Sequence, residues 1–221
     1  MGKVDVVVVG YVFQLSGLVG DDWETGIEDG KEKLFAWQKR TLPSGSTIAF
    51  LECMASLWGD ASRELVRSLK ELNGARCVIY VGKAGSLRLG DPPNALLVTG
   101  SNSYLGSELT SWDNVLNPAA SEAEGVLRGD IVTVMSPLLE SAAWLAEWQP
   151  KCDWVDCEVG HMALASREQN TGFGYLLLIS NNVARYGRET LANEDSAHIQ
   201  RRREVLFRRV EDVLRRFLDE N

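Results

Sequence analysis

The sequence lacks a long apolar run, a surplus of positive charge and any internal repeat, and these absences exclude several classes of protein. Its apolar stretches are short, such as residues 6–9, whereas a membrane-spanning helix needs about 20 apolar residues. Lys and Arg number 23 against 31 Asp and Glu, which argues against the clustered positive surface that nucleic-acid binding requires. We therefore expect neither a membrane nor nucleic acid as a partner.

Cysteine is scarce, and its spacing is uninformative for metal binding. The four cysteines, at positions 53, 77, 152 and 157, match no zinc pattern, and free buried thiols are ordinary in a reducing compartment. The N-terminus leads directly into a predicted strand, without the charged and then apolar layout of a secretory signal. These features predict a cytoplasmic protein without a metal site.

What the sequence does contain is typical of one globular domain spanning residues 1–221. Apolar residues make up 45% and charged residues 24% of the chain, enough for a single core. Strands are predicted over residues 4–10, 47–53, 76–82, 95–99, 131–134 and 174–180. Helices are predicted over residues 59–74, 136–148 and 195–218, with another ending near residue 167. This alternation predicts a layered α/β sheet, and the polar stretch 100–129 predicts a long loop.

Three segments carry more specific information. In the first, the strand around residues 78–81 runs into Gly-Lys-Ala-Gly-Ser at residues 82–86, with Gly90 and Asp91 shortly after. Glycines at the end of a strand allow backbone N–H groups to approach a ligand closely. The second segment is Val-Asp-Cys-Glu at residues 155–158, and the third is Leu-Ile-Ser-Asn at residues 178–181. Their separation (181 minus 158, or 23 residues) suits one helix followed by one strand.

Together these segments resemble three motifs of the nucleoside phosphorylase and nucleosidase superfamily: a Val-Gly-Thr-Ala-Gly-type turn, a Val-Glu-Met-Glu segment and a strand-end Ile-Ser-Asp. The resemblance implies a three-layer α/β/α fold with a central mixed β-sheet, and a homo-oligomer that acts on a nucleoside-like small molecule. Glu158 would hold ribose, since two adjacent hydroxyls can both donate to a carboxylate. The substrate-binding residues that it implies are Gly82, Ala84, Gly85, Cys157, Glu158, His161 and Ser180.

The sequence departs from these motifs at positions that matter for catalysis. Asn181 stands where the superfamily usually has an acid that protonates the base; an amide cannot deliver a proton, but it can hydrogen-bond to a 6-oxopurine. Residues 10–15 contain no carboxylate, although hydrolytic nucleosidases carry a water-activating glutamate there. Tyr80 also lies on the strand that often carries a phosphate-binding arginine. Tyr80 would not replace that arginine, but Lys83 could supply the positive charge instead. With the water-activating glutamate missing, we predict a phosphorylase over a hydrolase, with inorganic phosphate as a possible co-substrate and no other cofactor.

Lys83 and His161 each have more than one interpretation. The ammonium group of Lys83, in the predicted turn, would bind phosphate or another anion. If the group is buried, its pKa would instead be lowered, and it would act as a base or as a Schiff-base nucleophile. The simplest alternative is a lysine that points to solvent and has no role in the site. His161 shares a helix face with Glu158 and is either a ribose contact or a structural residue.

We therefore predict an enzyme that cleaves or forms the N-glycosidic bond of a nucleoside-like molecule, with Asn181 and Lys83 as catalytic residues. Two alternatives remain open. One is a biosynthetic enzyme of the same fold that uses these two residues on a non-nucleoside substrate. The other is a non-catalytic ligand-binding protein.

Overall fold

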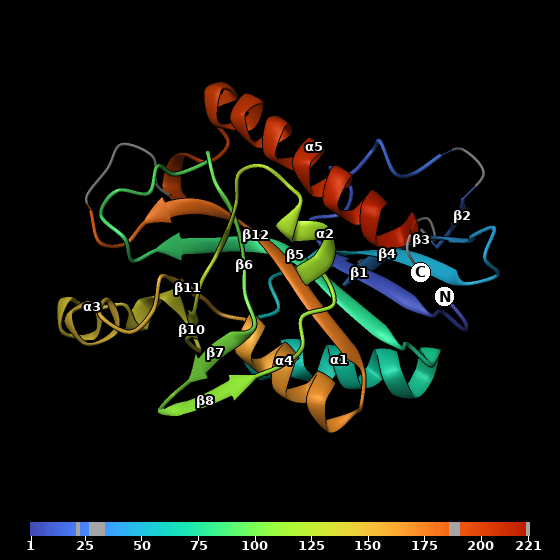
Figure 1. Ribbon diagram of the computed structural model, residues 1–221, viewed down its shortest axis with the longest axis horizontal. Coiled ribbons are helices and arrows are strands. Elements are labelled where there is room, and N and C mark those ends of the chain that lie inside the picture. Colours follow the sequence, from blue (N-terminus) through green and yellow to red (C-terminus); the bar gives the residue numbers. More distant parts are fainter. Residues whose placement is uncertain (21–22, 27–33, 186–190, 220–221) are drawn as a thin grey trace.

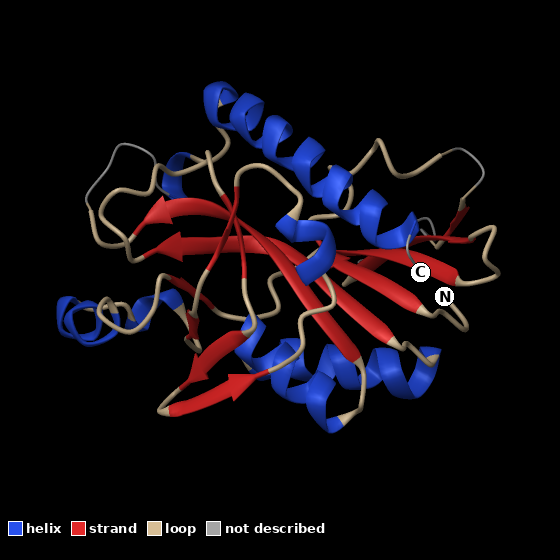
Figure 2. Cartoon of the chain, in the orientation of Figure 1, coloured by secondary structure: helices blue, strands red, loops and turns tan. Residues whose placement is uncertain are grey.

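The computed structural model describes the chain except for residues 21–22, 27–33, 186–190 and 220–221, and its centre is a mixed β-sheet (Figures 1 and 2). The strands are β1 (Val6–Gly10), β2 (Glu24–Thr25), β3 (Phe35–Thr41), β4 (Thr47–Cys53), β5 (Cys77–Ser86), β6 (Leu97–Thr99), β7 (Asn102–Leu105), β8 (Glu108–Ser111), β9 (Val126–Arg128), β10 (Ile131–Thr133), β11 (Trp154–Asp156) and β12 (Gly172–Asn182).

The long strands β5 and β12 form the middle of this sheet. The main order is β2-β3-β4-β1-β5-β11-β10-β7-β8, while β12 pairs with β5 and β6, and β6 with β9. Strands β4, β1, β5 and β12 run parallel, whereas β3 pairs antiparallel with β4 and β11 pairs antiparallel with β5. The predicted mixed sheet is therefore confirmed, and the parallel group brings four carboxyl ends to one edge.

Helices cover both faces of the sheet. They are α1 (Asp60–Asn73), α2 (Asn117–Ser121), α3 (Ala142–Trp148), α4 (Val159–Glu168) and α5 (Ala197–Asp219), with short 3₁₀ turns η1 (Pro137–Leu139) and η2 (Leu191–Asn193). Helices α1 and α4 lie side by side on one face, and α5 crosses the opposite face next to α2 (Figure 1). The arrangement is the predicted three-layer α/β/α fold. Among the described residues, no helix is long and apolar enough to cross a membrane.

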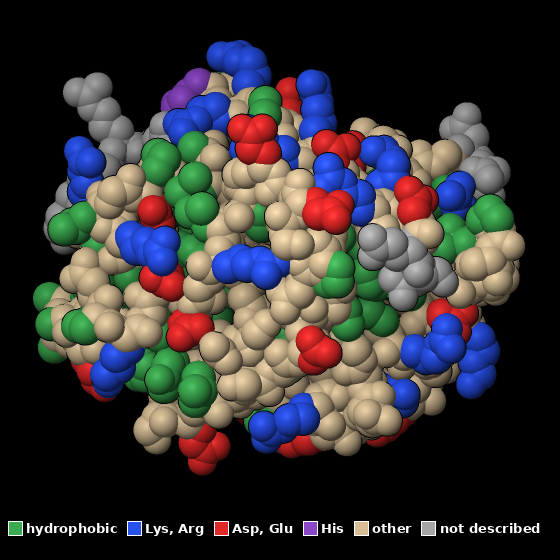
Figure 3. All heavy atoms as spheres, in the orientation of Figure 1, with side chains coloured by type: hydrophobic (Ala, Val, Ile, Leu, Met, Phe, Trp, Pro, Cys, Tyr) green, Lys and Arg blue, Asp and Glu red, His purple; other side chains and the backbone are tan. Residues whose placement is uncertain are grey.

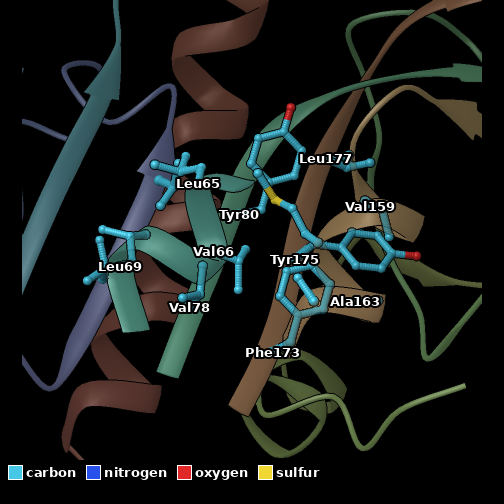
Figure 4. Close-up of a cluster of buried hydrophobic side chains, with 14 of the residues drawn as sticks. Leu65, Val66, Leu69, Val78, Tyr80, Val159, Ala163, Phe173, Tyr175 and Leu177 are labelled. Carbon is cyan, nitrogen blue, oxygen red and sulfur yellow. The ribbon is translucent and has the colours of Figure 1, made fainter. Parts of the chain in front are cut away.

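An apolar layer holds each set of helices on the sheet. Val66 of α1 and Ala163 of α4 pack with Val78 and Phe173 of the central strands, and all four side chains are at most 2% exposed (Figure 4). On the other face, the buried side of α5 covers β1, β4, β5 and β12 with an apolar row that includes Leu206, Val210, Val213 and Leu214. Both faces of the central strands are thus buried, which explains their continuous apolar runs.

Helix α1 illustrates how the sequence sets the ends of an element. Its buried positions Leu65, Val66 and Leu69 recur at helical spacing. Gly74 ends the helix in the left-handed region, with φ of 72°, and its N–H donates to Lys70. The predicted apolar position Leu72, in contrast, is 75% exposed, because it lies on the side of the helix that faces away from the sheet.

The predicted turn at residues 82–86 is wrong: this segment is the second half of strand β5. It pairs with β12 from Gly82 to Ser86, and Gly85 and Ser86 also pair with β11. The small side chains permit this close packing, because a Cβ at Gly82 would lie 2.4 Å from the Tyr80 ring. The segment therefore presents its side chains alternately to the two faces of a strand, instead of wrapping backbone N–H groups around a ligand.

Two further predictions need correction. The predicted long loop at residues 100–129 contains β7, β8, α2 and β9. The predicted helix at residues 136–148 is divided into η1 and α3, because Ser136 caps the first and Ser141 caps the second through its bond from the Trp144 N–H. Strand β3, which pairs along its whole length with β4, was not predicted.

Candidate active site

A cavity of about 480 Å³ opens where β1, β4, β5 and β12 end and α4 begins. The carboxyl ends of parallel strands are the usual ligand position in an open α/β sheet. Most of the predicted site residues line this cavity: Lys83, Ala84, Gly85, Cys157, Glu158, Ser180 and Asn181. Three segments that are far apart in the sequence are therefore brought to one site.

Asp156 organises the start of α4 beneath the cavity. Its Oδ2 accepts hydrogen bonds from the N–H groups of Glu158 (3.1 Å) and Val159 (2.6 Å), and its Oδ1 accepts one from the Thr133 hydroxyl at 2.6 Å. Burial raises the pKa of Asp156 to about 6, although these three hydrogen bonds oppose the shift. The carboxylate caps the start of α4, and it thereby holds the backbone of Glu158 in place.

Glu158 is a half-buried acid that lines the cavity. Burial and the nearby charge of Asp156 raise the pKa of Glu158 to about 8. The N–H of Cys157 donates to its Oε2 at 3.3 Å, and the Tyr80 hydroxyl and Lys83 also favour its charged form. Near neutral pH this carboxyl group can therefore be either donor or acceptor toward a ligand hydroxyl.

Lys83 is an ion-paired ammonium. Its Nζ donates to Oε2 of Glu194 at 2.8 Å and to Oε1 at 3.1 Å, and it lies 5.0 Å from the centre of the Tyr11 ring. Burial opposes its charge, but hydrogen bonds with Glu194 and Tyr11 prevail and raise the pKa of Lys83. Glu194 also accepts from Arg203 at 3.0 Å. The interpretations of Lys83 as a low-pKa nucleophile and as a solvent-facing residue are therefore wrong.

Strand β12 places Ser180 and Asn181 at the cavity, at a point where its pairing with β5 is irregular. The pairing with β5 shifts between Ile179 and Asn181, so that Asn181 lies opposite Gly85. Such bulges redirect side chains, often beside active sites. The Ser180 hydroxyl donates to Oδ1 of Asn181 at 2.9 Å. This bond engages Oδ1 of Asn181, so Nδ2 is the atom of this amide that can donate to a ligand.

Gly82 and His161 do not belong to the lining of the cavity. Gly82 provides room for the Tyr80 ring, as described above. His161 lies on α4 against α1, where its Nδ1 is 3.4 Å from Oδ1 of Asp60 and its side chain is 5% exposed. Burial lowers the pKa of His161, which favours the neutral ring. For His161 the structural interpretation agrees with this placement.

Glu52 lines the cavity and is the main residue that sequence reasoning missed. It is the penultimate residue of β4, beside Gly10 of β1, and its Oε2 accepts hydrogen bonds from the N–H groups of Val12 (2.7 Å) and Phe13 (2.8 Å). Burial raises the pKa of Glu52, and the two hydrogen bonds moderate that increase. Its one signal in the sequence is an acidic residue at the carboxyl end of an otherwise apolar strand.

The cavity is strongly acidic. Its lining includes the carboxyl groups of Glu52, Glu140, Asp156, Glu158 and Glu194. Lys83 is the single basic residue among the described lining residues, and Glu194 neutralises it. Arg203 of α5 lies outside the lining and binds Glu194 from behind it, and on the face shown in Figure 3 basic and acidic side chains are interspersed over this helix. The cavity is therefore poorly suited to an anion.

Neither metal nor thiolate chemistry is supported at this site. Within the part of the chain that the structure describes, no group of three or more His, Cys, Asp or Glu side chains could hold a metal ion. Cys53 and Cys157 line the cavity, but burial and neighbouring carboxylates raise the pKa of both thiols, to about 12 for Cys53. Both therefore stay protonated and poorly nucleophilic near neutral pH.

No protein-family model and no curated protein matches the sequence, but solved structures match over nearly its whole length. Futalosine hydrolase of Helicobacter pylori has a TM-score of 0.73 at 16% identity, covering 99% of this chain and 98% of that one. The 5′-methylthioadenosine/S-adenosyl homocysteine nucleosidase of Campylobacter jejuni has a TM-score of 0.73 at 12% identity, covering 96% and 99%. The corresponding nucleosidase of Neisseria meningitidis, in complex with methylthio-immucillin-A, has a TM-score of 0.70 at 16% identity, covering 98% and 99%.

The chain therefore shares the fold of futalosine hydrolase and of these nucleosidases, which agrees with the fold that its motifs predicted. The low identities make it a divergent example of that fold. Because one fold can host many reactions, its chemistry has to be argued from the cavity.

Proposed function

We propose that this protein hydrolyses the N-glycosidic bond of a nucleoside or nucleoside-like small molecule. The observation that carries the proposal is the cavity at the carboxyl ends of the parallel strands, where Glu158 and Asn181 face the same space as the acidic residue Glu52. The similar solved structures are named as a hydrolase and as nucleosidases, which supports the same class of bond.

Glu158 and Asn181 are proposed to orient the substrate. Glu158 would bind the ribose hydroxyls, and the Nδ2 of Asn181 would donate to the base. Ala84, Gly85, Cys157 and Ser180 would form the walls between them. Because Asn181 cannot protonate the base, catalysis would depend on orientation of the sugar and on carboxylates that stabilise the positive charge of an oxocarbenium-like transition state.

Water fits this cavity better than phosphate as the attacking group, although the sequence alone favoured phosphorolysis. Phosphate would need compensating cations, and the ammonium group of Lys83 is already paired with Glu194. At about 4 Å, with an effective dielectric constant of about 20, two like unit charges repel by about 4 kcal/mol. The carboxyl groups would therefore oppose phosphate binding wherever they are ionised. The oligomeric assembly implied by the resemblance stays a prediction.

A nucleoside panel assayed with and without inorganic phosphate tests the proposal. We expect release of free base and free ribose in phosphate-free buffer, measured by chromatography and by a reducing-sugar assay. A strict requirement for phosphate, with formation of a sugar 1-phosphate, would contradict hydrolysis. If no nucleoside is cleaved but ligands still bind, and Glu158→Ala weakens that binding, the result would favour a non-catalytic binding protein.

A further inference from the structure

The loop after β1 contains no acidic residue, but the fold brings one to it from another strand. Glu52, at the end of β4, lies in register with Gly10, the last residue of β1. Its carboxylate caps the N–H groups of Val12 and Phe13 in that loop. Building on the proposed hydrolysis, we infer that Glu52 is the general base that takes a proton from the attacking water.

The hydrogen bonds of Glu52 hold one oxygen and leave the other available. Oε2 accepts both backbone N–H groups, at 2.7 and 2.8 Å. Among the described residues, no hydrogen bond to Oε1 is found, and Glu52 lines the cavity. A base needs this arrangement, because its position must be fixed while a lone pair remains free for the proton.

The other acidic residues of the cavity are less suited to this role. Both oxygens of Asp156 are used to cap α4 and to bind Thr133. Glu194 is held by Lys83 and Arg203. Glu158 is assigned to the ribose hydroxyls. Glu140 lies between η1 and α3, and within the described part of the chain no hydrogen bond fixes its side chain.

Glu52 and Glu158 also border the same part of the cavity. The thiol of Cys53, which follows Glu52 directly, experiences the charges of both carboxyl groups. A sugar held by Glu158 would therefore lie within the region that Glu52 faces. Burial raises the pKa of Glu52, which makes its carboxylate a stronger base than an exposed glutamate.

The proposed step balances in atoms and in charge. The oxygen of water bonds to the anomeric carbon, and the bond from that carbon to the base nitrogen breaks, with its electron pair leaving on the base. Glu52 takes one proton from water, and the departing base takes one proton from solvent. Glu52 then releases its proton to solvent, so the products are free sugar and neutral base.

Glu52→Gln is the variant that tests this role. The amide oxygen of Gln can still accept the two backbone hydrogen bonds, so the loop is preserved while the basic oxygen is lost. We expect kcat for nucleoside hydrolysis to fall by about 10²–10⁴-fold, with KM changed by less than about threefold and a thermal midpoint no lower than that of the unsubstituted protein. Glu71→Gln on the exposed side of α1 is the matched control, with activity equal to that of the unsubstituted protein.

Chemical rescue separates a base from a residue that only supports the loop. In Glu52→Ala, added formate should restore part of kcat, with rescue increasing as formate becomes ionised. In the unsubstituted protein, kcat should rise with pH through the pKa of Glu52. The kcat of Glu52→Gln should not show this rise.

Three results would overturn the inference. One is an unchanged kcat in Glu52→Gln, and another is an equal loss in Glu140→Gln, which would assign the effect to total cavity charge. The third is a Glu52→Ala variant that folds but is not rescued by any small carboxylate. If the unsubstituted protein hydrolyses no nucleoside at all, the proposed function itself fails, and the two failures are thereby distinguished.

Discussion

At the scale of single residues, the main feature is a cluster of acids whose ionisation is suppressed by burial. Glu158 is the clearest case, because its pKa of about 8 is caused by burial first and by Asp156 second. Its folded pKa lies above its usual value of 4.5. Ionisation therefore favours the unfolded chain, and Glu158 lowers stability progressively as the pH rises from about 4.5 to about 8.

Glu158→Gln is therefore predicted to stabilise the protein while weakening its activity. A neutral amide of the same shape removes the cost of a buried charge, so we expect the free energy of unfolding to rise by about 1–3 kcal/mol at pH 8 and to change little at pH 4.5. Urea denaturation at both pH values measures this difference. An equal effect at both pH values would show that the ionisation of Glu158 is not the cause.

Most of the site residues predicted from the sequence line the cavity, but the sequence did not reveal their ion pairs or protonation. Glu158, Lys83 and Asn181 were found because each occupies a position within a short motif. The pairing of Lys83 with Glu194 spans 111 residues along the chain and leaves no local pattern. Glu52 was missed for a similar reason: the hydrogen bonds that hold it come from the loop after β1, about 40 residues earlier in the chain.

At the scale of elements, the start of α4 depends on one buried carboxylate. Asp156→Ala removes the acceptor for two backbone N–H groups and for the Thr133 hydroxyl. We expect it to lower the free energy of unfolding by about 1–2 kcal/mol, and we expect a smaller loss for Asp156→Asn, which keeps an acceptor oxygen. Chemical denaturation provides the measurement. If both variants were as stable as the parent, the cap would not support the helix.

The elements most accurately predicted are those with an unambiguous pattern. Strand β4 has the predicted bounds of residues 47–53, and α1 ends at the predicted glycine. The segment 82–86 was mistaken for a turn because its glycines suggest flexibility. Two neighbouring strands nevertheless pair with it, and that pairing depends on residues about 70 to 100 positions later. Local propensity alone does not reveal such partners.

At the scale of the whole molecule, stability should depend on the two apolar layers that hold helices to the sheet. Phe173 is 2% exposed between α4 and the sheet, whereas Leu72 on α1 is 75% exposed. We expect Phe173→Ala to lower the free energy of unfolding by about 3–5 kcal/mol and Leu72→Ala to change it by no more than about 0.5 kcal/mol. Urea titration of both variants tests the assignment of the core, and similar losses in the two would contradict it.

The ion pairs from Lys83 to Glu194 and from Glu194 to Arg203 connect the middle of the chain to its last helix. During synthesis on a ribosome, β1, β4 and β5 emerge long before α5 does. Until then, Lys83 would face an incomplete pocket with its ammonium group unneutralised. Lys83 acquires its partner only after residue 194 has been made and α5 has docked, so the last part of this fold to be synthesised completes the charge balance of the cavity.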